Sequence, residues 1–339
     1  MKQKVLVTGG AGYIGSHTVL ELLNNNYSVV VVDNLSNSSR EGLRRVEQIT
    51  QKTIDFEEID IRDGDALSRV FERYDIQSVL HFAGHKSVGE SVAKPLQYYD
   101  NNFTGTLSLC EVMQRFNVYE LIFSSSATVY GATTQCPISE SAPIGATTNP
   151  YGSSKYMVER MLMDLAKSDP QWRIATLRYF NPVGAHPSGQ LGEDPNGVPN
   201  NLVPFVSQVA VGKLSEVKVF GNDYNTADGT GVRDYIHVVD LALGHIAALQ
   251  YMEEHQGFEA FNLGTGRGHS VLNIISAFEK YSGQKVPFRI VERRSGDIAE
   301  CFANPNKAKD ILNWSAERDL KEMMEDTWRW QSKNPSGYS

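Results

Sequence analysis

The sequence predicts an α/β protein with a doubly wound parallel sheet and a smaller, loop-rich second lobe. Within residues 4–33, a short apolar run, a glycine-rich turn, a helical segment, a second apolar run and an acid follow one another. Apolar runs and helical segments then alternate to about residue 178, as they do where helices connect parallel strands. Polar or small residues follow several of these runs, at the strand ends where such sheets bind ligands.

The composition is that of an ordinary globular protein, with 41% hydrophobic residues among 339. The formal net charge of −8 argues against a nucleic-acid partner or an anionic membrane surface. Cys110, Cys136 and Cys301 are widely spaced and lack metal-ligand spacing. We therefore expect reduced thiols in a cytoplasmic protein, and no metal site.

The N-terminal residues lead directly into an apolar run at 4–7, which predicts that there is no signal peptide. No stretch of the sequence is both long enough and apolar enough to span a membrane. We therefore expect a protein without a membrane partner.

The first 33 residues follow the order of a dinucleotide-binding unit. Residues 4–7 predict a buried strand, a helix follows to about Asn25, and residues 28–32 predict a second strand that ends at Asp33. The turn between the first strand and the helix contains three glycines: Gly9, Gly12 and Gly15. Such glycines let the backbone approach a pyrophosphate, which lies on the N-terminus of the helix.

The acid at the end of the second strand selects the cofactor. Asp33 is expected to accept a hydrogen bond from the adenosine ribose. It would also repel a 2′-phosphate, so the pattern predicts NAD rather than NADP. Arg40 is the one nearby cation in the sequence that argues for NADP.

Further alternating segments are expected to complete the sheet. The predicted strands are 56–61, 78–82, 121–124 and 174–178, and the predicted helices are 94–116 and 151–167. The candidate ligand contacts at strand ends are Asp33, Asp60, Gly84, Ser126 and Asn181. Parallel strands end at one edge of a sheet, so these residues are expected to meet there.

Tyr151 and Lys155 are candidate catalytic residues, because residues four apart share one face of a helix. An ammonium beside a phenol favours the phenolate and lowers its pKa from about 10. Tyr151 would then accept a proton from a sugar hydroxyl near neutral pH. A second Tyr-x-x-x-Lys begins at Tyr281, but Gly283 within it indicates a helix end. Tyr151 begins a helix at the predicted ligand edge, and Tyr281 does not.

The composition changes after Phe180. Residues 182–201 are rich in Pro, Gly and Asn and show little periodicity, which predicts a loop-rich lobe over the substrate. The elements expected in this lobe are a helix to about Val211, an apolar run at 217–220, and helices at 271–281 and 320–331. A helix at 239–252 and a strand at 260–262 are expected to return to the first lobe.

These residues resemble the extended short-chain dehydrogenase/reductase family, and within it the branch that epimerises UDP-galactose and UDP-glucose at carbon 4. The matching segments are 8–17, 33–35, 81–84, 88–91, 123–131, 178–187, 220–224 and 228–238. The first and third are shared across the superfamily, whereas the last two, Phe-Gly-Asn-Asp-Tyr and Asp-Gly-Thr-Gly-Val-Arg-Asp-Tyr-Ile-His-Val, are more specific to the branch. His85 and Ser153 depart from the family pattern. We expect His85 to be a tolerated loop residue beside the cofactor, and charge tuning is the alternative.

The resemblance implies NAD-dependent, reversible epimerisation of a UDP-hexose through a 4-keto intermediate. Tyr151 would take the proton of the sugar 4-hydroxyl while carbon 4 gives a hydride to NAD. Ser126 would hydrogen-bond the 4-oxygen, and Lys155 would tune Tyr151 and hold the nicotinamide ribose. The keto sugar would turn over before the hydride returns to its opposite face. Because NAD is regenerated in each turnover, it would stay bound.

The resemblance also implies, position by position, two sets of contact residues. The cofactor set comprises the three glycines and Tyr13, Ile14, Asp33, Asn34, Asn37, Ser38, Asp60, Ile61, Phe82, Ala83, Gly84, Lys86, Asn101, Ser126, Tyr151, Lys155 and Phe180. The substrate set comprises Lys86, Ser126, Tyr151, Asn181, Asn201, Leu202, Phe220, Arg233, Arg294, Asp297 and Cys301. The forked donors of Arg233 and Arg294 suit a pyrophosphate, and two surface arginines are the alternative.

The family resemblance predicts the organisation of the chain. Residues 1–181 are expected to form the NAD-binding Rossmann domain, with a returning segment at about 236–262, and 182–235 and 263–339 the UDP-sugar-binding lobe. Family members pair the helices at 94–116 and 151–167 into a four-helix bundle across a dimer, so we expect a homodimer. Apolar residues on more than one face of these helices fit this: Leu107, Leu109, Val112, Met157, Met161 and Leu165. Packing on the sheet would explain part of the pattern.

Cys301 is the predicted determinant of substrate breadth. In the family, the corresponding position lies beside the sugar's 2-substituent, and a tyrosine there goes with UDP-glucose and UDP-galactose alone. A small residue goes with acceptance of the N-acetylated sugars as well. A cysteine leaves the room that a phenol ring would fill, which predicts dual specificity. A small buried hydrophobe without this role is the alternative, and a register slip would put Phe302 there instead.

Two other functions are alternatives to epimerisation. A nucleotide-sugar 4,6-dehydratase or decarboxylase on the same fold is one; a dehydratase needs an acid–base pair just after the serine run. Ala127 and Thr128 occupy those positions. A non-catalytic NAD-sensing module is the other, and it would be expected to have lost Tyr151 or Lys155.

Overall fold

The computed structural model describes residues 3–133, 135–294 and 296–338. Met1 and Lys2, which precede the first predicted strand, and Ser295, next to Arg294, lie outside the described residues. The chain divides into two compact units. The first comprises Met1–Gly131, Ala142–Tyr179 and Ala242–Phe261, and the second comprises Ala132–Ser141, Phe180–Leu241 and Asn262–Ser339.

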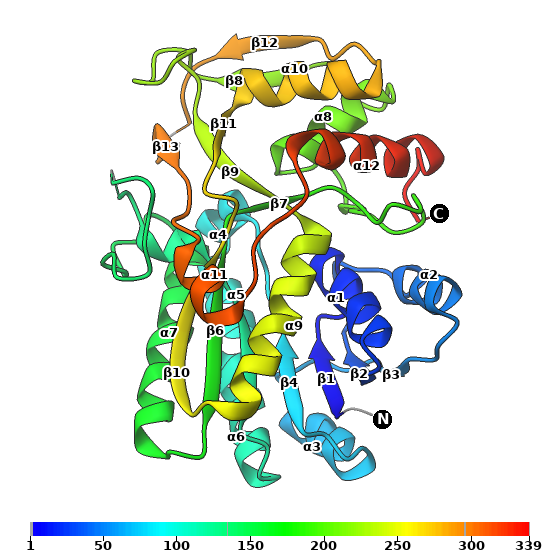
Figure 1. Cartoon of the computed structure of the whole chain (residues 1–339), viewed down its shortest axis with the longest axis vertical. Helices are drawn as coiled ribbons and strands as arrows, with labels where there is room; N and C mark the ends of the chain where they lie inside the picture. The colour runs from blue at the N-terminus through cyan, green and yellow to red at the C-terminus, as the bar shows by residue number, and fades with distance from the viewer. Residues whose placement is uncertain (1–2, 134, 295, 339) are drawn as a thin grey trace. The chain divides into compact units, whose positions relative to one another are not determined.

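A seven-stranded sheet forms the middle of the first unit, in the order β3-β2-β1-β4-β5-β6-β10 (Figure 1). The strands are β1 (Lys4–Thr8), β2 (Ser28–Val32), β3 (Asp55–Glu57), β4 (Ser78–His81), β5 (Glu120–Ser126), β6 (Arg173–Tyr179) and β10 (Gly257–Leu263). From β3 to β6, neighbouring strands are parallel. The order reverses between β1 and β4, which makes this the topological switch point of the sheet. The predicted doubly wound parallel sheet is confirmed.

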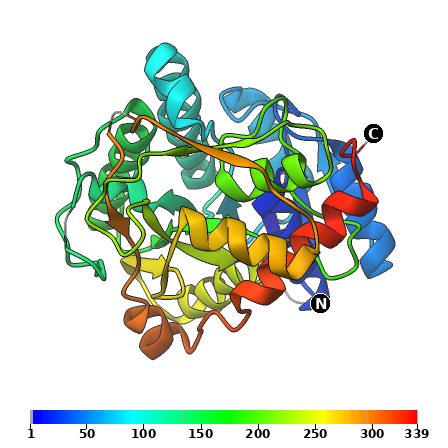
Figure 2. The same cartoon turned by 90° about the horizontal axis from the view of Figure 1, so that it is seen from above.

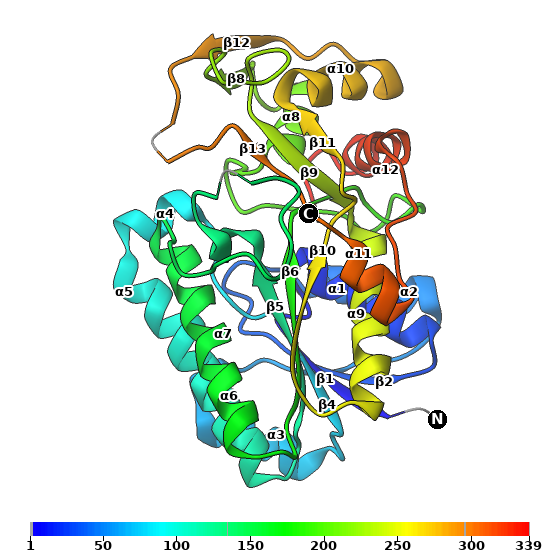
Figure 3. The same cartoon turned by 60° about the vertical axis from the view of Figure 1, so that its left-hand side comes forward.

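Helices cover both faces of this sheet, with α6 and α7 on one face and α1 and α9 on the other (Figure 3). The helical elements of this unit are α1 (Tyr13–Asn24), α2 (Arg40–Thr50), α3 (Gly64–Arg73), α4 (Val88–Ala93), α5 (Pro95–Tyr98), the π-helical turn η1 (Tyr99–Thr104), α6 (Gly105–Arg115), the 3-10 turn η2 (Ala127–Tyr130), α7 (Pro150–Ser168) and, from Ala242 onward, α9 (Val238–Glu254). Parallel strands that are covered on both faces are apolar along most of their length. Leu6, Val79, Leu121 and Ile174, on four neighbouring strands, are fully buried, and each such side chain contributes about 1.5–3 kcal/mol to stability.

Two sequence expectations for this unit were wrong in detail. The strand predicted at 56–61 ends at Glu57, because Asp60 turns the chain by accepting from the backbone N–H of Asp63 at 3.0 Å. The helix predicted at 94–116 is not one α-helix, because η1 interrupts it at Asn101 and Asn102. Such π-helical turns are often found at functional sites.

In the second unit, β9 is the middle strand of a small sheet and pairs with β7, β11 and β13, and β8 pairs with β12. The strands are β7 (Asn181–Val183), β8 (Val217–Phe220), β9 (Val232–His237), β11 (Gly268–Ser270), β12 (Phe288–Val291) and β13 (Glu300–Cys301), and the helices are α8 (Leu202–Ala210), α10 (Val271–Ser282), α11 (Asn306–Leu312) and α12 (Leu320–Lys333). Helices α10 and α12 lie side by side (Figures 1 and 2). Their facing sides and α8 share one apolar core.

The helix ends of this unit follow local sequence signals. Asp319 and Glu322 form a capping box at the start of α12, in which each side chain accepts from the other residue's backbone N–H. Gly283 ends α10 at a φ of 71°, a left-handed conformation that favours glycine. The Tyr-x-x-x-Lys that begins at Tyr281 therefore leaves the helix after one residue.

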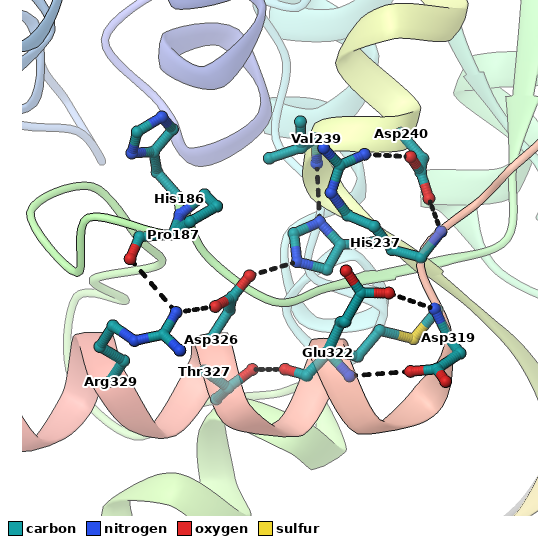
Figure 4. A network of polar contacts seen from close by, with 12 residues as sticks. His186, Pro187, His237, Val239, Asp240, Asp319, Glu322, Asp326, Thr327 and Arg329 are labelled. Atoms are coloured by element: carbon teal, nitrogen blue, oxygen red, sulfur yellow. Dashed lines mark hydrogen bonds and ion pairs between the residues drawn. The ribbon is translucent and has the colours of Figure 1, made fainter.

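A polar network ties α12 to the end of β9 (Figure 4). The fully buried ring of His237 contacts Asp326 through Nε2 at 3.2 Å and accepts from the Val239 backbone N–H through Nδ1 at 3.1 Å. Asp326 also pairs with Arg329. Because both ring nitrogens have a partner, the histidine needs no contact with solvent.

Among the described residues, no helix has both the length and the apolar character needed to cross a bilayer.

Glu120, the first residue of β5, is a buried acid in the first unit. It is 1% exposed, and within the described chain neither carboxylate oxygen has a hydrogen-bond partner. Nη1 of Arg173 lies 3.7 Å from Oε2. Burial raises the pKa of Glu120 to about 7, although the charge of Arg173 opposes the shift.

This acid is expected to make stability depend on pH. Folded Glu120 keeps its proton up to about pH 7, whereas an ordinary glutamate loses it near 4.5. Its stabilising contribution is therefore complete below 4.5 and is lost as the pH rises through 7, with a slope of up to about 1.4 kcal/mol per pH unit. Glu120→Gln, which stays neutral, should be more stable than wild type at pH 8 and nearly equal to it at pH 5. Urea unfolding at both pH values measures this; an unchanged pH dependence would contradict it, and exposed Glu254→Gln is the matched control.

Candidate active site

The turn between β1 and α1 has no room for side chains at two glycines. Gly9 has a φ of +69°, and a Cβ there would lie 2.6 Å from the backbone nitrogen of Ala83. A Cβ on Gly15 would lie 2.3 Å from the carbonyl oxygen of Gly9. Helix α1 begins after Gly12 with no side chain capping it. Its N-terminal N–H groups and positive dipole end therefore suit an anion.

Asp33 follows β2 directly and joins the next loop to the glycine turn. Its Oδ2 accepts from the backbone N–H of Ala11 at 3.0 Å. Its Oδ1 accepts from the backbone N–H of Leu35 at 2.9 Å and from the hydroxyl of Ser38 at 2.8 Å. Two residues of the predicted cofactor set, Asp33 and Ser38, thus lie in contact.

Two more residues of that set, Asn34 and Asp60, also meet. Nδ2 of Asn34 donates to Asp60 at 3.0 Å. The guanidinium of Arg62 binds both oxygens of Asp60 and lowers the pKa of that carboxyl. Arg40, the cation that argued for NADP, stacks over the ring of Phe56 at 4.7 Å.

Asn102, which the sequence interpretation missed, clamps the loop after β4. Its Oδ1 accepts from the backbone N–H of His85 at 2.7 Å, and its Nδ2 donates to the His85 carbonyl at 3.0 Å. The same Nδ2 donates to Ser154 on α7 at 2.9 Å. Asn101 also accepts from the His85 N–H, at 3.2 Å. The loop comprises four residues of the predicted cofactor set: Phe82, Ala83, Gly84 and Lys86. Two adjacent asparagines within a predicted helix were the available signal.

The ring of His85 packs against Tyr98, with centroids 5.3 Å apart. Burial lowers the pKa of His85, so the uncharged ring is favoured at neutral pH.

Helix α7 begins with strong local signals. Oδ1 of Asn149 caps it by accepting from the backbone N–H of Gly152 at 2.9 Å, and Pro150 is its first residue. Tyr151 and Lys155 therefore lie in its first turns. The cap sets where the helix starts, and hence the direction of both side chains.

The electrostatics of this pair differ from the sequence expectation. Nζ of Lys155 donates to the carbonyl of Ser124 at 2.7 Å, and burial lowers the pKa of Lys155 to about 8. Burial raises the pKa of Tyr151, while a hydrogen bond with Ser126 and the charge of Lys86 oppose the shift. The expectation that Lys155 lowers the pKa of Tyr151 is wrong for the protein alone, because burial outweighs nearby positive charge.

Three residues of the predicted substrate set cluster in the second unit. The guanidinium of Arg294 lies over the ring of Phe220 at 4.6 Å, and its Nε donates to Asp297 at 3.0 Å. Phe220 ends β8, and the other two lie in the loop after β12. Three others of the substrate set lie apart in sequence: Asn181 begins β7, and Asn201 precedes Leu202, the first residue of α8. Phe180, from the predicted cofactor set, follows β6.

Arg233 on β9 and Cys301 on β13 are directly paired strand neighbours. Asp234, whose role the sequence interpretation missed, holds their surroundings together. It is fully buried and accepts from the backbone N–H groups of Thr265 at 2.9 Å and Ala303 at 3.1 Å. The carboxylate thus joins β9 to the segment after β13.

Comparison with known proteins supports one family. The model of the NAD dependent epimerase/dehydratase family matches residues 5–264. UDP-glucose 4-epimerase of Bacillus subtilis (strain 168) is 61% identical over 334 residues, 98% of each chain. The human UDP-glucose 4-epimerase is 57% identical over 344 residues, which cover 100% of this chain and 99% of the relative.

A solved structure is similar along its whole length. The crystal structure of UDP-glucose 4-epimerase from Bifidobacterium longum, in complex with NAD+ and UDP, has a TM-score of 0.96 and 55% identity, and the match covers 98% of this chain and 99% of that one. The family model spans more than half of the sequence, and the relatives align along nearly all of it. The chain therefore belongs to the NAD dependent epimerase/dehydratase family.

Proposed function

We propose that the chain interconverts UDP-galactose and UDP-glucose by NAD-dependent epimerisation at carbon 4. The observation that carries the proposal is the group formed by Tyr151, Ser126 and Lys155 at the carboxyl end of β5. The Ser126 side chain lowers the pKa of the Tyr151 phenol against the effect of burial, and Lys155 donates to Ser124 two residues earlier. A base, an oxygen-binding hydroxyl and a cation are the groups that oxidation of a sugar hydroxyl needs.

The first unit suits NAD. The bare glycine turn and the uncapped N-terminus of α1 receive the pyrophosphate, and Asp33 accepts from the adenosine ribose. The guanidinium of Arg40 stacks on the ring of Phe56 and is therefore not placed to bind a 2′-phosphate. The preference for NAD over NADP then depends on Asp33. When bound, NAD+ accepts the hydride from carbon 4, and its cationic ring favours the phenolate of Tyr151.

Three residues of the first unit act on the sugar. Tyr151 takes the proton from the 4-hydroxyl and later returns it to the opposite epimer. Ser126 donates to the 4-oxygen and stabilises the charge that develops on it. Lys155 holds positive charge near the phenol and binds the nicotinamide ribose.

The second unit binds the UDP part. The guanidinium groups of Arg233 and Arg294 bind the pyrophosphate through forked hydrogen bonds, and Asp297 holds Arg294 in place. The remaining contacts are Asn181, Asn201, Leu202 and Phe220. The two units are accordingly a NAD-binding domain and a UDP-sugar-binding lobe.

Cys301 makes the substrate range broad enough to include the N-acetylated UDP-hexoses. Residues paired across strands point to the same face of a sheet, so Cys301 shares a face with Arg233. Its neighbour Phe302 points to the other face, next to Gly268. Cys301, rather than Phe302, therefore lies on the same face of the sheet as Arg233, which is assigned to the pyrophosphate. A thiol there leaves space for an acetamido group.

The chain forms a homodimer through α4, α5, α6 and α7. Exposed apolar side chains gather on these elements: Val88, Val92, Leu96, Leu107 and Met157. Leu96 is 82% exposed and Val92 64%. Leu109 and Val112 belong to the sheet core, and Met161 and Leu165 pack against it, so packing on the sheet explains that part of the apolar pattern on these helices. Large apolar side chains exposed together on such elements are typical of a contact with another protein surface.

The location is cytoplasmic. Cys110, Cys136 and Cys301 are free thiols, which persist in a reducing compartment.

The first prediction from the proposed function concerns the base. Tyr151→Phe should keep NAD and UDP binding and lose at least ~10²-fold in turnover, because it removes the proton acceptor. The assay follows conversion of UDP-galactose to UDP-glucose without net release of NADH, which also excludes a dehydratase and a non-catalytic NAD sensor. Tyr281→Phe, in the other Tyr-x-x-x-Lys, should leave turnover unchanged. Near wild-type turnover in Tyr151→Phe would refute the assignment.

The second prediction concerns substrate breadth. Wild type should epimerise UDP-N-acetylglucosamine and UDP-N-acetylgalactosamine, and Cys301→Tyr should lose this activity while it keeps UDP-galactose. Cys301→Ala, which keeps a small side chain, should retain both activities. Absence of the acetylated activity in wild type, or its survival in Cys301→Tyr, would defeat the idea.

The third prediction concerns assembly. Wild type should have twice the chain mass of 37.7 kDa by light scattering at micromolar concentration. Val92→Glu/Leu96→Glu should be monomeric, because burying two carboxylates in an apolar interface is unfavourable. Val198→Glu changes a similarly exposed residue of the second unit, 63% exposed, and should remain dimeric. A monomeric wild type would overturn the proposal.

A further inference from the structure

A buried ion pair lies one helical turn beyond Lys155 on α7. Glu159 on α7 is 0% exposed and Arg178 on β6 is 3% exposed. Nη2 and Nε of Arg178 donate to the Glu159 carboxylate at 2.7 and 3.1 Å. Ser125 on β5 donates to the same carboxylate at 2.5 Å. Three elements of the first unit therefore meet at one carboxylate.

The positions of these residues link the pair to the active site. Glu159 follows Lys155 by one helical turn, so both lie on the same face of α7. Ser125 lies between Ser124, which accepts from Lys155, and Ser126, whose side chain lowers the pKa of Tyr151. Arg178 also donates to Tyr130 in η2 at 2.9 Å.

We propose that Glu159, held by Arg178 and Ser125, is a positioning residue that supplies the counter-charge for the ammonium of Lys155. This inference rests on the function proposed for Lys155. A buried ammonium needs an opposite charge nearby, because burial alone favours its neutral form. An ion pair placed only for stability could be exchanged for apolar residues without loss.

The other groups around Lys155 do not replace this carboxylate. His81 on β4 is fully buried, and burial lowers its pKa to about 3, so it is neutral. In the protein without NAD, Tyr151 on α7 is uncharged at neutral pH, because burial raises its pKa. Burial lowers the pKa of Lys155, and the charge of Glu159 opposes that shift. Lys86 adds positive charge near Tyr151, not negative charge near Lys155.

The test separates charge from packing with three variants. Glu159→Gln removes the carboxylate charge and leaves the positive charge of the buried Arg178 uncompensated. Glu159→Gln/Arg178→Met removes the whole pair, which guards against failure to fold. Arg178→Lys keeps both charges but loses the pair of guanidinium hydrogen bonds to Glu159. It is therefore the control for a change in structure without a change in charge. The titration of Lys155 is measured by NMR in protein with isotopically labelled lysine, and the resonance is assigned by its loss in Lys155→Arg.

Lys155 should titrate about one pH unit lower in Glu159→Gln than in wild type, because the counter-charge is gone. In the double variant it should also titrate lower than in wild type, but by less, because the positive charge of Arg178 is removed together with the carboxylate. In Arg178→Lys it should titrate as in wild type. The basic limb of the pH–kcat profile for UDP-galactose should move with the lysine in each variant.

A folded double variant in which Lys155 titrates as in wild type would overturn the proposal. A shift in Arg178→Lys as large as that in the double variant would also overturn it, because packing would then be the cause. If wild type lacks epimerase activity, the proposed function fails, and the lysine titration still decides whether Glu159 sets the charge of Lys155.

Discussion

Parallel pairing is the constraint on which the first unit depends. The register aligns Thr8 with His81 and His81 with Phe123, and Ser126 with Tyr179. The carboxyl ends of β1, β4, β5 and β6 therefore lie along one edge of the sheet, and the helices that follow begin at that edge. This is why the glycine turn, the loop after β4 and the start of α7 gather there although they are far apart in sequence.

The same edge buries many polar groups, and their hydrogen bonds make it rigid. Thr8 contacts Nδ1 of His81 at 2.6 Å, and Nε2 of the same ring contacts Thr106 at 2.8 Å. Thr106 then donates to the carbonyl of Asn102 at 2.6 Å, and Asn102 holds the loop after β4. A buried chain in which each group has a partner specifies one arrangement, because any displaced member would be left unpaired.

The second unit differs from the first, because loops follow its short strands β8, β12 and β13. Buried carboxylates hold these loops in place. Asp234 accepts from the loop before β11 and from the segment after β13, and Asp240 accepts from the backbone N–H groups of Glu317 and Arg318 at 3.1 and 2.8 Å. Long loops are thus held by charge-assisted hydrogen bonds to buried acids.

The sequence by itself determined the fold class, the family and the preference for NAD, because these depend on local features. Apolar runs define strands, glycines define the turn before α1, and Asp33 ends the second strand; the bounds predicted for residues 28–32 and 217–220 are those of β2 and β8. The roles of the individual contact residues stay predictions.

Only the tertiary structure decided which polar residues stabilise the ligand-binding edge of the sheet and in which direction the pKa of Tyr151 is shifted. Asn102, Asp234 and the Glu159–Arg178 pair depend on contacts between distant segments, which no local pattern reveals. The pKa of Tyr151 is the clearest case. Its spacing from Lys155 predicts a lowered value, but burial by the surrounding elements raises it, because desolvation depends on everything packed around the hydroxyl and not on one helical neighbour.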